Sequence, residues 1–366
     1  MAELSYNPPR FSSHNREDFG PTLRKRVNAH FKSNNISKTG DYRIWIKVIL
    51  LPLFYLIPFV IIITNSFSNH LLPFYSLWLL MGLALAGCGL SVMHDACHGS
   101  LSRSKKVNNF IGASILNFAA GSSINWKIQH NVLHHSFTNI EGHDEDISPS
   151  GVMRFSPNQP KKKAFRFQAF YAWFFYGLMT FLWATSKDFS QLFRFKKMGL
   201  IESQGKSFSK ELMLLIIRKV IYYAVFLVLP TLLLDVAWYH VIMGWFAMHF
   251  LAGLILAIIF QCAHVVPSTE FPLPNDDNRI ENDPAAHQLM TTANFANNNR
   301  TLSWFVGGLN YQIEHHLFPN ICHVHHRDIS KIVKETAGEF GLPYHSTPAF
   351  SIALADHVKF LNRLGR

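Results

Sequence analysis

Four long blocks of apolar residues constrain this chain more than any other feature of its sequence. They cover residues 44–64, 72–92, 219–234 and 238–263. A helix needs about 20 apolar residues to cross a hydrocarbon core roughly 30 Å thick, and a helix satisfies all of its backbone polar groups there. A soluble chain would scatter its apolar residues between polar ones. The blocks therefore predict an all-α integral membrane protein with four transmembrane helices.

Two further apolar stretches, 110–120 and 167–183, are shorter or more amphipathic. We interpret them as interfacial or re-entrant helices. No internal repeat or low-complexity tract divides the chain. The sequence therefore predicts one membrane domain over residues 44–350, with an N-terminal segment (1–43) before it and a C-terminal tail (351–366) after it.

The basic residues predict how the four helices are oriented, because Lys and Arg accumulate at the cytoplasmic ends of spans. Of the 34 Lys and Arg residues, 8 precede the first span, 15 lie between residues 93 and 210, and 8 follow the last span. We expect Lys47 to snorkel and Lys219 to lie at the cytoplasmic end of the third span. Both termini and the large middle segment are expected to be cytoplasmic, in a bacterial inner membrane or the endoplasmic reticulum.

The net charge of +11 does not indicate a nucleic-acid partner. Its sidedness and its attraction to anionic lipid headgroups account for it, and no basic nucleic-acid-binding motif is present. The four cysteines, Cys88, Cys97, Cys262 and Cys322, form no C-x-x-C motif and fit a reducing compartment.

Twenty histidines are many for a chain of 366 residues, and they cluster beside the ends of spans. His94 and His98 continue directly from the second span and share one helix face. His130 and His134 share a face in the same way, whereas His135 is expected to point well aside. Imidazole nitrogens bind several transition metals. The second group can therefore offer ligands to two neighbouring centres.

A third group and one further histidine are expected on the same side of the membrane. Gln312 and His316 lie on one side of a helix and His315 is adjacent, while His264 ends the last span. A single histidine pair is commonly two surface side chains. Several clusters that converge on one membrane face instead predict a cytoplasmic, histidine-rich, metal-binding cap.

The number of candidate ligands indicates two metal ions. Seven clustered histidines, with His264 as an eighth and Gln312 as an auxiliary ligand, exceed what one ion can bind. Imidazole suits Zn, Cu, Fe and Ni, so ligand type leaves the metal open. Asp95 and Glu314 are expected to orient ligating rings, or else to be solvated charges. Four other histidines are expected to support the site rather than to bind metal: His143, His323, His325 and His326.

The patterns H-x3-H, H-x3-HH and Q-x2-HH, at these positions relative to the spans, resemble the membrane fatty acid desaturase superfamily over about residues 40–350. Residues 310–319, with Gln312 at the first position of the third box, are similar to the front-end (delta-5, delta-6 and linoleoyl-CoA desaturase-like) type. The resemblance implies an O2-dependent oxidoreductase with two Fe ions that introduces a cis double bond into an acyl chain. It also implies these metal ligands: His94, His98, His130, His134, His135, His264, Gln312, His315 and His316.

Two features depart from many front-end enzymes. Three residues separate His130 from His134, where many have two, and the HPGG motif of a fused cytochrome b5 domain is missing. The resemblance therefore implies a separate electron donor, cytochrome b5 or ferredoxin with its reductase. It also implies a fatty acyl-CoA or acyl-lipid substrate, which would enter a tunnel from the membrane lipid.

Other functions stay open at this point. A hydroxylase, a ketolase or a sphingolipid desaturase of the same superfamily would use the same centre. A non-catalytic metal-binding receptor or transporter is less favoured, because transporters place ionisable groups at mid-membrane. The basic run 161–163, with Arg154 and Arg166, would anchor the chain at the membrane surface or bind the phosphates of an acyl-CoA. The patterns specify neither the position of the double bond nor the chain length.

Overall fold

Helices make up nearly all of the regular structure. The computed structural model describes residues 6–12, 18–66, 70–148 and 151–366. Within these ranges the strands form two parallel pairs of two residues each: β1 (Arg10–Phe11) with β2 (Arg279–Ile280), and β3 (Asn294–Phe295) with β4 (Ser346–Thr347). The predicted all-α class is confirmed.

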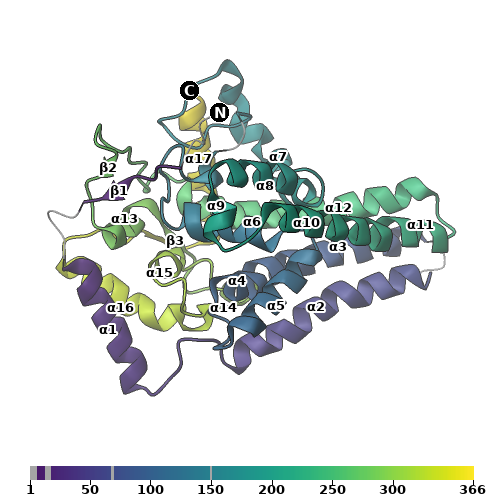
Figure 1. Cartoon of the computed structure of the whole chain (residues 1–366), viewed down its shortest axis with the longest axis horizontal. Coiled ribbons are helices and arrows are strands. Elements are labelled where there is room, and N and C mark those ends of the chain that lie inside the picture. Colours follow the sequence, from purple (N-terminus) through teal and green to yellow (C-terminus); the bar gives the residue numbers. More distant parts are fainter. Residues whose placement is uncertain (1–5, 13–17, 67–69, 149–150) are drawn as a thin grey trace.

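Four long apolar helices lie side by side and form one elongated arm of the molecule (Figure 1). The first is α2 (Tyr42–Ile63) and the fourth is α12 (Trp238–His264). The second joins α3 (Leu71–Gly87), a π-helical stretch η1 (Cys88–Met93) and α4 (His94–His98). The third joins α10 (Phe208–Tyr223), a π-helical stretch η5 (Ala224–Val228) and α11 (Leu229–Leu233). All four predicted membrane-spanning helices are present.

The remaining helices gather at one end of the arm (Figure 1). They are α1 (Phe19–Ser33), α5 (Lys105–Asn117), α6 (Ser123–Lys127), η2 (Ile128–His134), η3 (Glu145–Ile147), η4 (Lys163–Phe167), α7 (Gln168–Ala184), α8 (Lys187–Lys197), α9 (Leu200–Ser203), α13 (Pro284–Thr291), α14 (Arg300–Phe305), α15 (Gln312–Leu317), η6 (His323–His325), α16 (His326–Glu339) and α17 (Phe350–Gly365). The two apolar stretches 110–120 and 167–183 fall mostly on α5 and α7. Their interfacial or re-entrant placement stays a prediction.

The fourth span is the centre of the packing, and glycines let its neighbours approach closely. A Cβ added at Gly253 of α12 would lie 2.6 Å from the carbonyl oxygen of Gly177 in α7. A Cβ added at Gly82 of α3 would lie 2.6 Å from the carbonyl oxygen of Met248 in α12. Small residues allow such backbone contact between membrane helices. Helix α12 is thereby held between α3 and α7.

The helix that carries the third predicted span begins at Phe208, before the predicted start of that span at Lys219. Polar residues in its first turns interrupt the apolar block that defines a span in sequence. Lys219 therefore lies inside the helix, where its side chain is buried. Its Nζ donates to the carbonyl oxygens of Trp183 (2.7 Å) and Ala184 (3.1 Å) and lies 3.6 Å from Asp188 Oδ2. The lysine thus satisfies carbonyl groups that the end of α7 leaves free.

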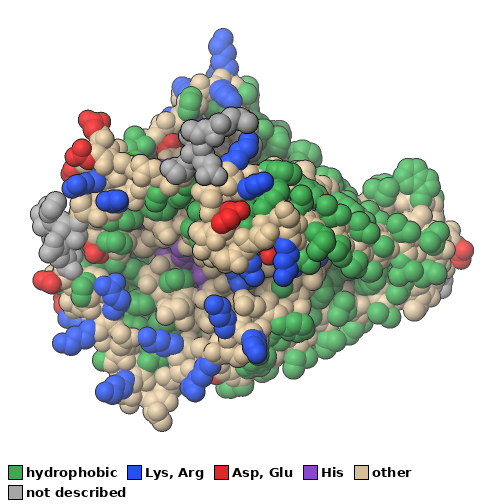
Figure 2. Space-filling model, in the orientation of Figure 1, with side chains coloured by type: hydrophobic (Ala, Val, Ile, Leu, Met, Phe, Trp, Pro, Cys, Tyr) green, Lys and Arg blue, Asp and Glu red, His purple; other side chains and the backbone are tan. Residues whose placement is uncertain are grey.

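Lys47 is also buried rather than snorkelling as predicted, with only 1% of its surface exposed. Its Nζ donates to the Trp304 carbonyl oxygen at 2.5 Å and to His323 Nε2 at 2.8 Å. The outer surface of the arm is instead covered by hydrophobic side chains, whereas Lys and Arg side chains gather on the opposite part of the molecule (Figure 2). This division fits an arm in lipid and a cap outside it.

Candidate metal centre

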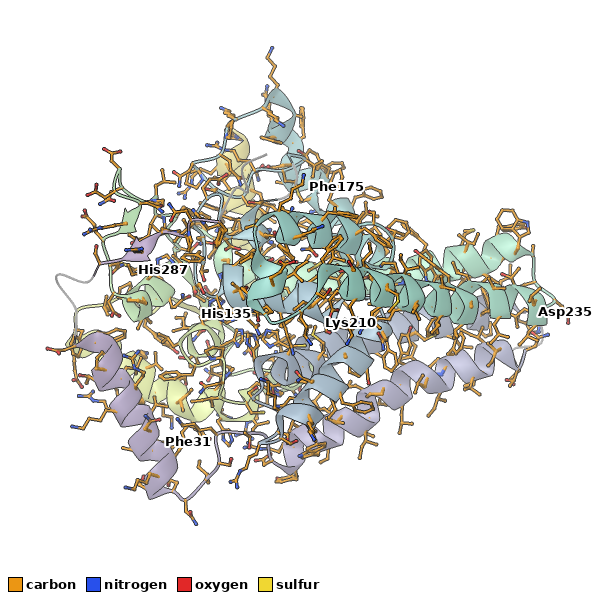
Figure 3. The ribbon with its side chains drawn as sticks, viewed as in Figure 1. Phe31, His135, Phe175, Lys210, Asp235 and His287 are labelled. Atoms are coloured by element: carbon orange, nitrogen blue, oxygen red, sulfur yellow. The ribbon has the colours of Figure 1, made fainter. Side chains whose placement is uncertain are left out.

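The predicted histidines converge where the arm meets the cap. They come from α4, from η2 and the residue after it, from the last residue of α12, and from α15. His135 lies in the middle of the molecule, and Asp235 marks the far end of the spans (Figure 3). Histidine side chains are visible in a hollow of the cap (Figure 2). The second span carries its histidines directly into this site, as the sequence predicted.

A first group of ligand atoms comes from His94, His98, His130 and His315, and all four lie within 4.8 Å of one another. The Nε2 atoms of His94 and His130 are 3.1 Å apart. Two nitrogen ligands about 2.1 Å from one ion, at roughly right angles, would lie about 3 Å apart. The spacing of this group therefore suits a shared ion.

A second group comprises His134, His264 and His316, and a third comprises His135, His315 and His316. The third group shares His315 with the first and His316 with the second. The histidines therefore form two neighbouring candidate metal sites, and His135 and the α15 histidines lie between them. The sequence predicted these residues on one side of the membrane, and the fold brings their rings close together.

Helix η2 changes the geometry expected for the second box. Its turn is π-helical, and the backbone N–H of His135 donates to the carbonyl oxygen of His130 at 2.9 Å. This bond spans five residues instead of four. The Nε2 atoms of His130 and His135 consequently lie 3.2 Å apart. The expectation that His135 points well aside is wrong, because it assumed a regular α-helix.

Hydrogen-bond acceptors hold the Nδ1 side of the second group. His134 Nδ1 lies 3.0 Å from Asp144 Oδ1, and His264 Nδ1 donates to the Thr291 carbonyl oxygen at 3.3 Å. His316 Nδ1 lies 2.9 Å from Gln288 Oε1. An acceptor at Nδ1 keeps the proton there and leaves the Nε2 lone pair for a metal. These rings are thus oriented before an ion binds.

Several Nε2 atoms in the cluster are buried without a hydrogen-bond partner among the described residues. They belong to His98, His134, His264, His315 and His316. A buried polar atom that stays unsatisfied costs roughly 1–3 kcal/mol. One ion in the first group and one in the second would together satisfy all five atoms. The donor set therefore fits a metal centre on the structure's own geometry.

The electrostatics of the cluster favour neutral rings. Burial and neighbouring histidines hold the pKa values of His130, His135, His315 and His316 well below the usual range. His134 is different. Burial alone would lower its pKa, but the nearby Asp144 and Asp146 raise it to about 9. Neutral imidazole is the form that binds metal, so an ion bound at His134 would take the place of the proton on Nε2.

Gln312 and the two predicted carboxylates lie close to the cluster in different settings. Gln312 starts α15 with its amide nitrogen buried and unpartnered within the described ranges. Asp95 accepts from His323 Nδ1 at 2.7 Å and from Cys322 Sγ at 2.9 Å, rather than from a clustered histidine.

Glu314 is held away from the clustered rings. It accepts from Asn294 Nδ2 and from Tyr344 Oη, both at 2.9 Å. Burial raises the pKa of Glu314 to about 7. Neither Asp95 nor Glu314 therefore orients a clustered ring in the direct way that the sequence suggested.

The four supporting histidines stay outside the three groups. His323 bridges Asp95 and Lys47, and His143 Nδ1 lies 3.2 Å from Tyr6 Oη. His325 and His326 donate to the backbone carbonyl oxygens of Thr39 and Ile321. Their rings serve the packing of the cap.

Sequence reasoning missed the residues that hold the second group. Asp144 and Asp146 stand in the segment after the second box, where only His143 had been singled out. Asp146 Oδ2 lies 3.5 Å from His134 Nδ1 and 3.9 Å from His130 Nδ1. The signal was present, since two carboxylates closely follow a histidine box. Gln288 carried no comparable signal, because it reaches the site only through the fold.

A cavity of about 670 Å³ opens beside the cluster. His130, Trp126 and Phe260 line the part of the cavity next to the rings, and Met179 and Phe175 of α7 line its apolar wall. The ring of Trp126 lies 4.5 Å from the ring of His130. An apolar chain in this cavity would lie against the candidate metal centre.

The sequence of this chain is similar to those of known proteins. A model of the fatty acid desaturase family matches residues 68–348. The chain is 34% identical to an sn-1 linoleoyl-lipid 6-desaturase of Synechocystis sp., over 95% of this chain and 96% of that protein. It is 32% identical to a protein of the same name from Arthrospira platensis, over 94% and 92%.

An acyl-lipid (8-3)-desaturase of Physcomitrium patens is also 34% identical, over 95% of this chain and 72% of that protein. The family match covers the second, third and fourth spans and all of the clustered histidines. With its apolar arm, its converging histidines and this similarity, the chain belongs to the fatty acid desaturase family.

Proposed function

We propose that this protein is a front-end acyl-lipid desaturase that introduces a cis double bond at position 6 of a linoleoyl chain. The observation that carries the proposal is the set of unpartnered histidine nitrogens beside an apolar cavity. The two relatives named as linoleoyl-lipid 6-desaturases match over nearly their whole length, which supports the substrate and the position. Gln312 at the head of the third box supports the front-end type.

The proposed metal ligands divide between two iron ions. The first ion would be held by His94, His98, His130 and His315, and the second by His134, His264 and His316, with His135 between them and Gln312 as an auxiliary ligand. Bound iron would supply the activation of O2 that an unactivated methylene requires, because such a carbon has no acidic proton. In the balanced reaction, two hydrogens from the chain and two electrons and two protons from outside reduce O2 to two water molecules.

The chain's own residues would position the substrate and exclude water. Trp126 and Phe260 cover the rings of His130 and His94, with ring centroids 4.5 to 6.5 Å apart. Phe175 and Met179 offer the apolar wall along which an acyl chain would lie. These apolar side chains would keep water from the reacting carbons.

We further propose that both termini and the metal centre face the cytoplasm, in a bacterial inner membrane or the endoplasmic reticulum. The distribution of Lys and Arg supports this orientation. Electrons would come from a separate cytochrome b5 or ferredoxin with its reductase. Residues 44–350 would form the catalytic domain, and α1 and α17 pack onto it from the two flanking segments.

Feeding defined fatty acids to a desaturase-deficient host that expresses the chain tests this function. We expect gas chromatography of the lipids to show a new product two mass units lighter than linoleate, with a double bond at position 6. The His315→Ala variant, expressed at the same level, should give none. An unchanged lipid profile with iron and an electron donor supplied would contradict the proposal, and a product 16 mass units heavier would indicate a hydroxylase.

A further inference from the structure

The cavity beside the metal centre has two chemically different walls. The α7 and α12 side is apolar, with Phe175, Met179 and Phe260. The side formed by η2, η3 and α8 is polar, with Gln129, Glu145, Asp146, Lys187, Gln191 and Arg194. Gln129 precedes His130, so the polar wall adjoins the metal centre. Phe260 of the apolar wall also lies beside the His130 ring, so the candidate centre lies where the two walls meet, next to a space that suits a lipid chain.

Most polar groups on this wall are already hydrogen-bonded to one another. Gln129 Nε2 donates to Asp146 Oδ1 at 2.6 Å, and Gln191 Nε2 donates to Gln129 Oε1 at 2.6 Å and to Glu145 Oε2 at 2.9 Å. Arg194 pairs with Glu145. These bonds tie the side chains of Gln129, Gln191, Glu145, Asp146 and Arg194 to one another.

Lys187 is the exception on the polar wall. Its Nζ lies 5.6 Å from the centre of the Trp183 ring, and it makes no hydrogen bond or ion pair with any residue that the structure describes. Burial lowers the pKa of Lys187, and the carboxylates of Asp146 and Glu145 oppose this shift. Its ammonium group thus offers three N–H donors to whatever enters the cavity.

We propose that Lys187 binds the carbonyl oxygen at the carboxyl end of the acyl chain, and that this contact determines which carbon meets the metal centre. The inference rests on the proposed function. Carbon 6 is five bonds of about 1.5 Å from the carbonyl carbon, so the two lie roughly 6 Å apart in an extended chain. Lys187 and His130 line the same cavity, so a carbonyl held on the polar wall would let carbon 6 reach the His130 side while the longer remainder of the chain lies along α7. Lys187 is a positioning residue here.

The first experiment compares Lys187→Met with Lys197→Met. Both residues lie on α8, but Lys197 is exposed and does not line the cavity. We expect Lys187→Met to desaturate an ester lipid about tenfold more slowly, since one charged hydrogen bond is lost, and to give double bonds at neighbouring positions as well as at position 6. Lys187→Arg, which keeps the donors, should largely restore the single position. Mass spectrometry of the products locates the double bonds.

A second experiment uses the unaltered protein, so it stands even where the methionine variant does not fold. An ether lipid of the same chain length lacks only the carbonyl oxygen. We expect it to react more slowly and at mixed positions. Position 6 alone, at the rate of the ester lipid, would overturn the proposal. So would a Lys187→Met variant whose rate and product match those of Lys197→Met.

Comparing substrates separates carbonyl binding from headgroup binding. Lys187→Met should form double bonds at mixed positions to the same extent with a phospholipid and with a galactolipid, which has no phosphate. The same comparison with acyl-CoA tests whether Lys187 also binds a thioester carbonyl. A defect confined to phosphate-bearing substrates would overturn carbonyl binding in favour of phosphate binding. If the unaltered protein forms no position-6 product from any of these substrates, the proposed function itself fails.

Discussion

Two regions of this molecule bury histidines, and the rings meet different surroundings in each. Where α7, α12 and α17 pack together, His357 Nδ1 donates to the Val265 carbonyl oxygen at 2.8 Å and its Nε2 lies 2.8 Å from Tyr176 Oη. In the cluster, His98 and His315 have Nε2 atoms with no hydrogen-bond partner in the part of the chain that the structure describes. All of these rings are buried or nearly so.

Burial alone therefore does not identify a metal-binding histidine. His357 satisfies both ring nitrogens and holds a helix in place, as His323 does between Asp95 and Lys47. Five of the clustered rings, those of His98, His134, His264, His315 and His316, leave Nε2 without a partner among the described residues, at a cost in stability. Several unsatisfied nitrogens in one place therefore indicate a bound ligand that satisfies them.

Removing a clustered ring should have the largest effect on function. We expect His98→Ala or His315→Ala to lower desaturase activity at least about 1,000-fold, while the protein still inserts in the membrane, because the spans do not depend on these rings. Product analysis and iron content measure the effect. Exposed His70→Ala is the control. Activity retained in either variant would remove that residue from the proposed ligands.

The acceptor behind a ring should matter next. Asp144→Asn keeps the size of the side chain but weakens the acceptor that orients His134, so we expect iron affinity to fall about 10- to 100-fold. Iron retention against increasing chelator measures it, with exposed Asp276→Asn as the matched control. Equal retention in the two variants would mean that Asp144 does not support the metal centre.

The satisfied histidine should show the opposite pattern. His357→Ala removes two hydrogen bonds between α17 and its neighbours, and we expect the free energy of unfolding to fall by about 2 kcal/mol with unchanged iron content. Thermal unfolding in detergent measures the loss. A His357→Ala variant with normal stability but depleted iron would contradict the assignment of His357 to packing rather than to metal binding.

Acidification should have a smaller effect, on the stability that His357 contributes. Burial lowers the pKa of His357 to about 4, so the folded protein keeps this ring neutral while the unfolded chain takes up a proton below about pH 6.5. Its contribution to stability is therefore complete above pH 6.5 and declines as the pH falls toward 4, by up to about 2 kcal/mol at pH 5.

The difference between the unaltered protein and His357→Gln, measured at pH 7.5 and at pH 5, isolates this ring from the clustered histidines. We expect the variant to lose less stability on acidification. If both proteins lose the same amount, His357 does not titrate on unfolding as proposed.

The sequence predicted much of this protein because membrane spans and histidine boxes are local patterns. An apolar block of sufficient length specifies a helix without reference to the rest of the chain. Four spans, the all-α class and the gathering of His94, His98 and the α15 histidines followed from such patterns. The helix of the third span extends further than its apolar block, because its first turns are polar and pack against the cap.

The tertiary structure decided how the rings are held and how the polar residues are paired. The π-helical turn of η2 brings His135 beside His130, and Asp144 and Gln288 reach the rings from segments with no fixed spacing to them. The fold also decides the settings of two lysines: Lys219 donates to carbonyl groups of α7, whereas Lys187 faces the cavity. Such partners meet only when distant segments pack together. Composition and periodicity therefore cannot predict them.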